Sequence, residues 1–143
     1  MPVTTEQFAA YLERVEASTS VCYVARRHAG DEIVGFFTIS EIVRGNFRSA
    51  YLGYGGVSAH TGRGYMTEGM HLVLRKARAQ LRLHRLEANI QPGNLASIAL
   101  ARRCGFVFEG FSQRYLKING RWRDHERWAI LLEMPPAQPR ESG

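Results

Sequence analysis

Cysteine is scarce in this sequence, and long apolar runs are missing from it. The two cysteines, Cys22 and Cys104, are too few for a disulfide framework, and no cluster of metal ligands surrounds either of them. No apolar stretch approaches the roughly 20 residues that a membrane-spanning helix needs. The opening residues Met1–Glu6 lack the basic and apolar regions of a signal peptide. These absences predict a cytoplasmic protein with neither a metal site nor a membrane partner.

Acidic residues are also outnumbered. The 143-residue chain has 19 lysines and arginines against 13 aspartates and glutamates, a formal net charge of +6. This excess favours a polyanionic partner, and nucleic acid or a small molecule with several phosphates would satisfy it equally. The apolar share of 45% and the charged share of 22% are typical of a globular domain. We expect one domain over residues 1–134 and a disordered, proline-containing tail at 135–143.

Hydrophobic periodicity predicts three helices and six strands. The expected helices cover 4–17, 66–81 and a short segment capped by Asn94 and ended by Gly105. The expected strands cover 21–28, 33–43, 50–57, 85–91, 106–118 and 121–134. Asn119-Gly120 lies between the last two apolar runs and is a strong hairpin signal. This order predicts a mixed α/β (α+β) fold whose sheet has helices on both faces.

The segment from Thr61 to Met66 joins a predicted strand to the strongest predicted helix. Gly62 and Gly64 let backbone N–H groups converge without obstruction by Cβ atoms, and the helix start adds unsatisfied N–H donors. Such a turn suits a pyrophosphate. It lacks the Gly-Lys-Ser/Thr ending of a P-loop and the third glycine of the dinucleotide fingerprint. Taken alone, two glycines at this spacing fit a purely structural turn equally well.

A series of further motifs follows this turn. They are Gly64–Glu68, Leu83–Ala88, Pro92 with Asn94 and Ser97, Gly105-Phe106, Glu109-Gly110, and Asn119-Gly120 with Trp122 and Asp124. In these motifs, from about Gly53 to Leu132, the chain resembles the GNAT superfamily of acetyltransferases. Within it, the chain is most similar to the RimJ/RimL-type N-terminal acetyltransferases of ribosomal proteins. The resemblance implies an acetyl-CoA-dependent N-acetyltransferase with a mostly antiparallel sheet and splayed central strands.

The resemblance also implies which residues hold acetyl-CoA. The family motif Q/R-x-x-G-x-G/A falls on Thr61–Met66, where Gly64 matches and both outer positions depart. It implies that backbone groups around Val57 pair with the pantetheine arm and that Asn94 meets the arm from the opposite side. The implied cofactor-binding residues are Val57, Gly62, Arg63, Gly64, Tyr65, Met66, Thr67, Asn94 and Ser97.

Ser97 is the implied catalytic residue. Many superfamily members have a tyrosine four residues before the Gly-Phe pair, where this chain has Ala101. The RimJ/RimL-type subgroup has a serine at the position of Ser97, and we expect it to hydrogen-bond or protonate the leaving thiolate. Without the resemblance, a serine in a first helical turn is better explained by local bonding to backbone. The general base is not identified, and Glu41, Glu87 and Glu109 are candidates.

The chain departs from the subgroup at its N-terminus. RimJ/RimL-type chains usually have a further strand and helix before the region that matches Thr4. We therefore expect an N-terminal strand and helix to be missing, and a homodimer in which a neighbouring chain replaces the strand stays open. The sequence therefore does not define the acceptor-binding side, or whether the missing segment impairs activity.

We expect direct attack of a primary amine on acetyl-CoA, foremost the N-terminal α-amine of a protein. An α-amine, with a pKa of about 7.7–8.0, needs a general base less than a lysine at about 10.4. One alternative is an acetyltransferase for a small amine, such as a polyamine or an aminoglycoside-like compound. Others are a CoA-binding protein without catalysis and a basic RNA- or ribosome-binding module that uses Arg75, Arg78, Arg82 and Arg85. We expect no specific nucleic-acid partner, because the sequence has no base-stacking motif.

Overall fold

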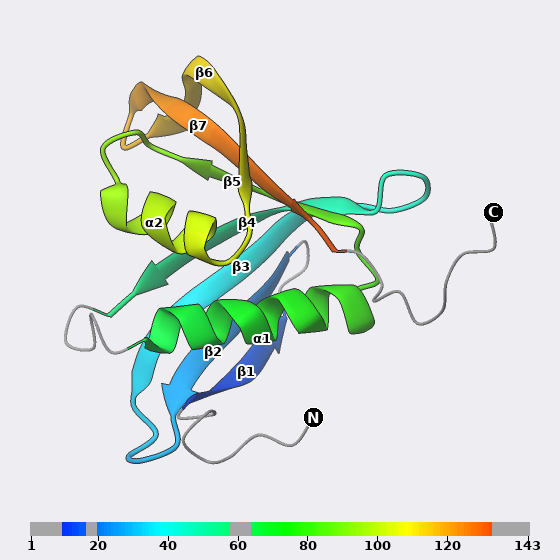
Figure 1. Cartoon of the computed structure of the whole chain (residues 1–143), viewed down its shortest axis with the longest axis vertical. Coiled ribbons are helices and arrows are strands. Elements are labelled where there is room, and N and C mark those ends of the chain that lie inside the picture. The colour runs from blue at the N-terminus through cyan, green and yellow to red at the C-terminus, as the bar shows by residue number, and fades with distance from the viewer. Residues whose placement is uncertain (1–9, 17–19, 58–63, 133–143) are drawn as a thin grey trace.

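The computed structural model describes residues 10–16, 20–57 and 64–132, which form one seven-stranded sheet and two helices (Figure 1). The strands are β1 (Ala10–Glu16), β2 (Ser20–Arg27), β3 (Ile33–Val43), β4 (Ser49–Gly56), β5 (Arg85–Ile90), β6 (Val107–Ile118) and β7 (Arg121–Leu131). The helices are α1 (Tyr65–Ala79) and α2 (Leu95–Arg103).

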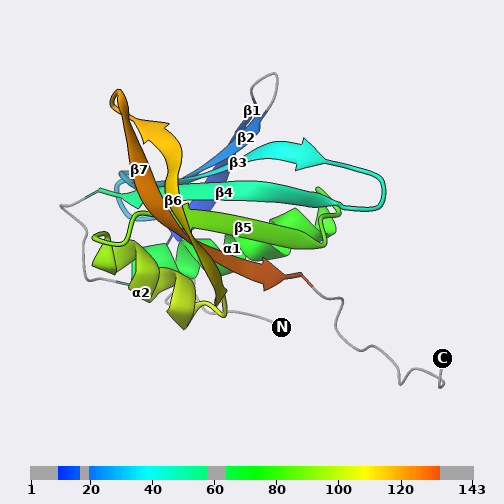
Figure 2. The same cartoon turned by 90° about the horizontal axis from the view of Figure 1, so that it is seen from above.

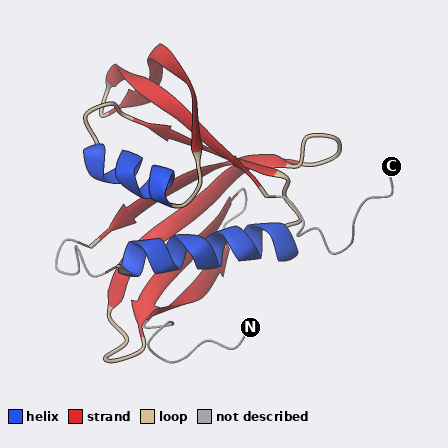
Figure 3. Ribbon diagram, viewed as in Figure 1, coloured by secondary structure: helices blue, strands red, loops and turns tan. Residues whose placement is uncertain are grey.

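The sheet is mixed and mostly antiparallel, as predicted (Figure 3). Its strand order is β1-β2-β3-β4-β5-β7-β6, and β4 with β5 is its parallel pair. Parallel neighbours cannot be joined by a tight turn, so the chain crosses from β4 to β5 through α1. At the other end, Asn119 and Gly120 have φ angles of 51° and 80°, as the predicted type I′ turn between β6 and β7 requires.

Both described helices lie on the same side of the sheet (Figures 1 and 2). Tyr23 and Phe37, on the helix side of β2 and β3, are fully buried. On the opposite face, Phe36 is 47% exposed and Tyr51 is 41% exposed. The described helices thus cover one face, whereas the prediction placed helices on both. Residues 10–16, the described part of the segment expected to supply a further helix, form a strand instead.

The predicted helix over residues 4–17 is wrong across its described part, which is the strand β1. The apolar spacing of Leu12 and Val15 fits a helix, but the two side chains reach different environments. Leu12 packs against the core, whereas Val15 is 48% exposed. β1 pairs with β2 along its whole length, and such non-local pairing overrides a local pattern. Residues 1–9 and 17–19 lie outside the described part.

Small residues let α1 approach the sheet closely. A Cβ atom on Gly69 would lie 2.8 Å from Cε1 of Phe37, and one on Gly56 would lie 3.2 Å from Cγ of Met66. Met70 and Val73 of α1 are fully buried in this contact. The close packing fixes where α1 begins relative to the end of β4. The tail at 135–143 and the domain limit at 134 lie outside the described residues and stay predictions.

Candidate active site

The central feature of the site is a gap where β4 and β5 separate. The two strands pair only from Ser49↔Arg85 to Tyr51↔Glu87. Beyond these residues β4 stays paired with β3 as far as Gly56, and β5 stays paired with β7 as far as Ile90. Two strand edges therefore face each other without pairing, which is the splay that the resemblance implied.

Backbone groups of known direction line this gap. The N–H of Val57 donates to Val34 O at 3.0 Å, so it is used within the sheet. Because antiparallel ladders alternate, the N–H groups of Tyr54 and Gly56 point away from β3, towards β5. On β5, the bond from Leu132 N–H to His84 O implies by the same alternation that the backbone of Asn89 faces β4. The free donors next to Val57 are thus Tyr54 and Gly56.

The start of α1 presents backbone N–H groups that the helix itself does not use. The first bond of the helix runs from Glu68 N–H to Gly64 O at 3.0 Å, so the N–H groups of residues 65–67 have no partner within the helix. Among the described residues, no side chain caps this end. Gly64 has a φ of 79°, and a Cβ atom there would meet nothing within 4 Å. The turn is therefore open to an anion. Gly62 and Arg63 lie outside the described residues, and their predicted role stays a prediction.

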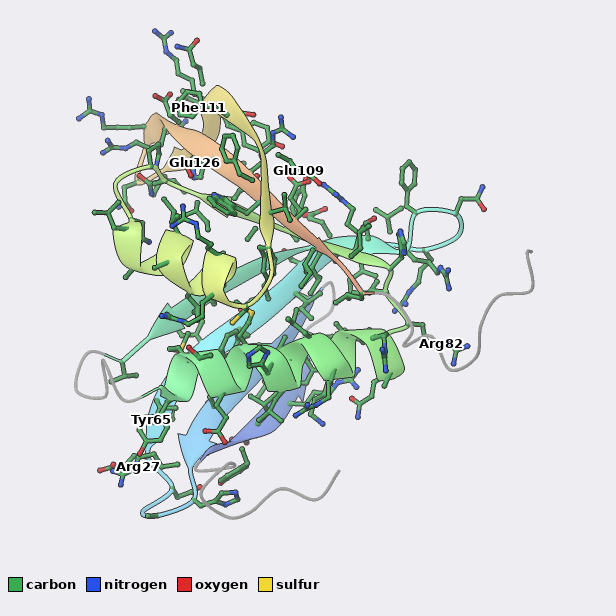
Figure 4. The ribbon with its side chains drawn as sticks, viewed as in Figure 1. Arg27, Tyr65, Arg82, Glu109, Phe111 and Glu126 are labelled. Atoms are coloured by element: carbon green, nitrogen blue, oxygen red, sulfur yellow. The ribbon has the colours of Figure 1, made fainter. Side chains whose placement is uncertain are left out.

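Arg27 adds a positive charge at this end of α1. Its guanidinium carbon lies 5.9 Å from the centre of the Tyr65 ring, and Figure 4 shows the two side chains together. Arg27 also pairs with Glu32, at 2.8 Å between Nη1 and Oε1. The sequence prediction missed Arg27, because β2 is remote in sequence from the glycine turn. The signal available was the Arg26-Arg27 pair at the end of a predicted strand.

On the other side of the gap, Tyr54 ties β4 to the first turn of α2. Its hydroxyl donates to Ser97 O at 2.7 Å, and burial raises the Tyr54 pKa, which keeps this donor protonated. Asn94 caps α2 by accepting the Ser97 N–H at 3.2 Å through Oδ1, which leaves the amide N–H groups as donors. The Ser97 hydroxyl makes no hydrogen bond to another described residue. Local bonding therefore does not account for this serine.

The face away from the helices holds the carboxylates that were candidates for a general base. Arg85 binds Glu87 at 3.0 Å and Glu109 at 2.8 Å. The hydrogen bond from Arg85 holds the pKa of Glu109 below its usual value. The neighbouring Tyr115 hydroxyl raises the pKa of Tyr51 on this face. Both ion-paired carboxylates, Glu87 and Glu109, are thus already bonded to a guanidinium.

Other side chains near the gap are less suited to chemistry. Glu41 is exposed and has a φ of 52° beside an irregularity in the β3–β4 ladder. Cys104 is buried, and burial raises the pKa of its thiol. Within residues 10–16, 20–57 and 64–132 no three His, Cys, Asp or Glu side chains gather as a metal site. No helix in the described part of the chain is long and apolar enough to cross a membrane.

Comparison with protein families identifies the fold. The model of the acetyltransferase (GNAT) domain matches residues 1–107, and the chain therefore belongs to the GNAT family. A probable N-acetyltransferase of Bacillus subtilis, YjcK, is 38% identical over 121 residues, which cover 85% of this chain and 67% of that protein. The [ribosomal protein uS5]-alanine N-acetyltransferase of Escherichia coli is 40% identical over 99 residues, 69% of this chain and 51% of that one.

Solved structures agree with this assignment. RimJ of Mycobacterium smegmatis, in complex with CoA-disulfide, superposes with a TM-score of 0.73 at 36% identity, over 79% of this chain and 53% of that one. A chimera of the spermidine N-acetyltransferase SpeG of Vibrio cholerae with hSSAT gives 0.70 at 26% identity, over 80% of this chain and 68% of the other. The chain thus spans about half to two thirds of the length of these relatives.

Proposed function

We propose that this chain transfers an acetyl group from acetyl-CoA to a primary amine, with the N-terminal α-amine of a protein as preferred acceptor. The observation that carries the proposal is the gap between β4 and β5, which opens beside a helix start that no described side chain caps. In a chain of the GNAT family, this arrangement provides both a slot for an extended arm and a seat for its phosphates.

The residues present fit acetyl-CoA. The N–H groups of residues 65–67 would hold the pyrophosphate, and Gly64 leaves the space above them open. Arg27 would add attraction for the phosphates. The unpaired edge of β4 at Tyr54 and Gly56 would bond to the pantetheine arm as an added strand does. The amide N–H groups of Asn94 would meet the arm from the α2 side.

In the transfer step, the neutral amine attacks the thioester carbonyl and the C–S bond breaks. A backbone N–H of Tyr54 or Gly56 would stabilise the oxyanion as it develops. The Ser97 hydroxyl would donate to the leaving sulfur, and the proton lost by the amine leaves through water. No acyl-enzyme is needed, and the buried Cys104 thiol, whose pKa is raised, is a poor nucleophile at neutral pH.

The charges on the acceptor side favour an α-amine over a polyamine. Deprotonating an α-amine at pH 7 costs about 1.4 kcal/mol or less, against roughly 4.6 kcal/mol for an amine with a pKa near 10.4. A polyamine site needs carboxylates that are free to bind several ammonium groups, but Glu87 and Glu109 are both bonded to Arg85. The Escherichia coli relative, named for the alanine of ribosomal protein uS5, is consistent with this choice. A polyamine is the second candidate, because of the likeness to SpeG.

Two measurements test this proposal on the chain as it stands. Titration calorimetry with acetyl-CoA should detect micromolar binding. Thiol release should then be faster with a peptide that begins with alanine than with spermidine, and absent with the same peptide blocked at its N-terminus. No binding of acetyl-CoA would reject an enzyme, and faster turnover of spermidine would reject the α-amine. Binding without any turnover would favour a CoA-binding protein that lacks catalysis.

A further inference from the structure

We propose that the end of α1 and the loop between β3 and β4 form a second anion site, which binds single-stranded RNA without sequence preference. We call this surface the basic end. It consists of the exposed side chains Arg44, Phe47, Arg48, Arg75 and Arg82. It goes beyond acetyl transfer, because none of these residues belongs to the site described above.

Hydrogen bonds join the two segments of the basic end into one surface. The carbonyl of Arg48 accepts the N–H of His84 at 2.6 Å and the N–H of Arg85 at 3.2 Å. The guanidinium of Arg44 donates to the carbonyl of Leu81. Figures 1 and 2 both place the β3–β4 loop at the same end of the molecule as the end of α1. The loop is therefore fixed against the helix end.

Neither segment of the basic end contains an acidic residue. No aspartate or glutamate occurs from Ile42 to Thr67, or from Gly69 to Leu86. Arg85 is excluded from the basic end, because Glu87 and Glu109 bind it. A surface with several arginines and no acidic residue in its own segments attracts phosphates, and each phosphate contact releases counterions from a nucleic acid.

Phe47 distinguishes this surface from a merely basic one. Its side chain is 69% exposed at a loop position between Arg44 and Arg48. Burial in the core does not explain an aromatic ring at this position. Proteins that bind single-stranded nucleic acid combine cations along the backbone with aromatic rings on which bases stack. The structure thus supplies the stacking residue that the sequence motifs lacked.

Two of the arginines occupy backbone positions that favour glycine. Arg48 has a φ of 44° and Arg82 a φ of 58°. In this left-handed region a side chain other than glycine crowds the backbone. Replacement of either arginine by glycine therefore removes the charge while it relaxes the backbone. These variants can test the charge without weakening the fold.

The basic end lies far from the proposed cofactor turn. α1 has 15 residues, so its two ends are about 22 Å apart. Figure 4 shows Arg27 and Tyr65 at one end of the helix and Arg82 at the other. RNA and acetyl-CoA should therefore bind independently, although both are polyanions.

Fluorescence anisotropy with a labelled 12-nucleotide single-stranded RNA tests the proposal. We expect RNA to bind, and we expect the logarithm of the binding constant to fall with the logarithm of the salt concentration at a slope of about −2. Contacts from three of the four arginines to one phosphate each would give this slope, at about 0.7 per contact. The double variant Arg48→Gly/Arg82→Gly should lower the magnitude of this slope by about 1.4. Phe47→Leu keeps an apolar side chain but removes the ring, and it should weaken binding about tenfold at an unchanged slope.

Matched controls separate this site from general electrostatics. The double variant Arg121→Gln/Arg123→Gln removes two exposed arginines from β7 and should leave RNA affinity nearly unchanged. Saturating acetyl-CoA should not displace the RNA. The proposal would be overturned if both double variants lost RNA affinity equally, or if acetyl-CoA displaced the RNA. Binding to phosphatidylserine vesicles without binding to RNA would overturn the proposal in favour of a membrane surface. An unchanged RNA affinity in the Phe47→Leu variant would overturn the role of base stacking.

Discussion

The two ends of α1 are suited to anions by different means. At its start, which we call the cofactor end, the donors are backbone N–H groups after Gly64, and Arg27 is the described cation beside them. At the basic end the donors are arginine side chains on the helix and a neighbouring loop. Backbone donors hold one geometry, which suits a reacting cofactor, whereas arginine side chains adapt to many phosphate positions. Damage to one end should therefore spare the other.

The largest expected effect is on catalysis at the cofactor end. Ser97→Ala should lower kcat by about a hundredfold or more, because general acid groups contribute about 10²–10⁴. The affinity for acetyl-CoA and for RNA should stay the same. Steady-state kinetics measure kcat, titration calorimetry measures the affinity for acetyl-CoA, and fluorescence anisotropy measures the affinity for RNA. Ser112→Ala, which removes a serine hydroxyl that accepts a bond from Arg127, is the control for loss of a serine hydroxyl outside the site. An unchanged kcat in Ser97→Ala would remove Ser97 from the mechanism.

The second prediction concerns the glycine that opens the cofactor end. Gly64→Ala places a side chain at a φ of 79°, so the turn should relax and move its N–H groups off the pyrophosphate. Loss of one bond to a charged group costs about 1.5–3 kcal/mol, so acetyl-CoA should bind about 10- to 150-fold more weakly. RNA binding should not change.

Gly120→Ala is the matched control for this variant. Gly120 has a φ of 80° and also has nothing within 4 Å of its ideal Cβ position. Both variants should lose similar free energy of unfolding, about 1–2 kcal/mol. If Gly120→Ala weakens the binding of acetyl-CoA as much as Gly64→Ala does, backbone strain explains the loss. The turn at Gly64 is then not an anion-binding site.

Much of the fold could be predicted from local sequence. The apolar stripe of α1, the Asn119-Gly120 turn and the Asn94 cap all act within a few residues, and the structure confirms each of them. β1 could not be predicted in this way. Leu12 and Val15 fit a helical period, and only pairing with β2 makes the segment a strand. Pairing with a neighbouring strand is invisible to a periodicity argument.

The candidate site divides along the same line. Gly64 and Ser97 could be proposed from motifs, because each lies at the start of a helix that follows its own turn. Arg27 and Tyr54 could not, since strand register brings them to the site from elsewhere in the chain. Val57 directly follows β4, and only the ladder alternation decides that its N–H faces β3.

The third prediction tests whether side-chain charge matters at the cofactor end. Arg27→Gln should weaken the binding of acetyl-CoA about fivefold, since a partly exposed charge contributes about 1 kcal/mol. The loss should shrink at high salt. Arg26→Gln removes the same charge from the next residue, whose guanidinium binds Glu13 at 2.7 Å, and serves as control. Equal weakening by both variants would mean that net charge, and not the position of Arg27, attracts the cofactor.

The smallest expected effect concerns Arg85, whose charge is paired with Glu87 and Glu109 and is therefore not counted in the basic end. Since the folded state lowers the pKa of Glu109, its ion pair stabilises the fold above the unfolded pKa of about 4.3 and is lost as the pH falls through the folded value. Glu109→Gln should therefore reduce the free energy of unfolding at pH 7 by less than about 1 kcal/mol, and by less still at pH 3. Urea unfolding at the two pH values measures this difference.

The same variant sharpens the contrast between the two ends. Glu109→Gln leaves Arg85 with one carboxylate partner, so its charge becomes partly available beside Arg48, whose carbonyl accepts the Arg85 N–H at 3.2 Å. RNA should then bind about twofold more tightly, while acetyl-CoA affinity stays constant. Glu13→Gln releases Arg26 instead, and it should leave the RNA affinity nearly unchanged. If both variants strengthened RNA binding equally, the total charge of the protein would determine RNA affinity. The basic end would then not be a distinct binding surface.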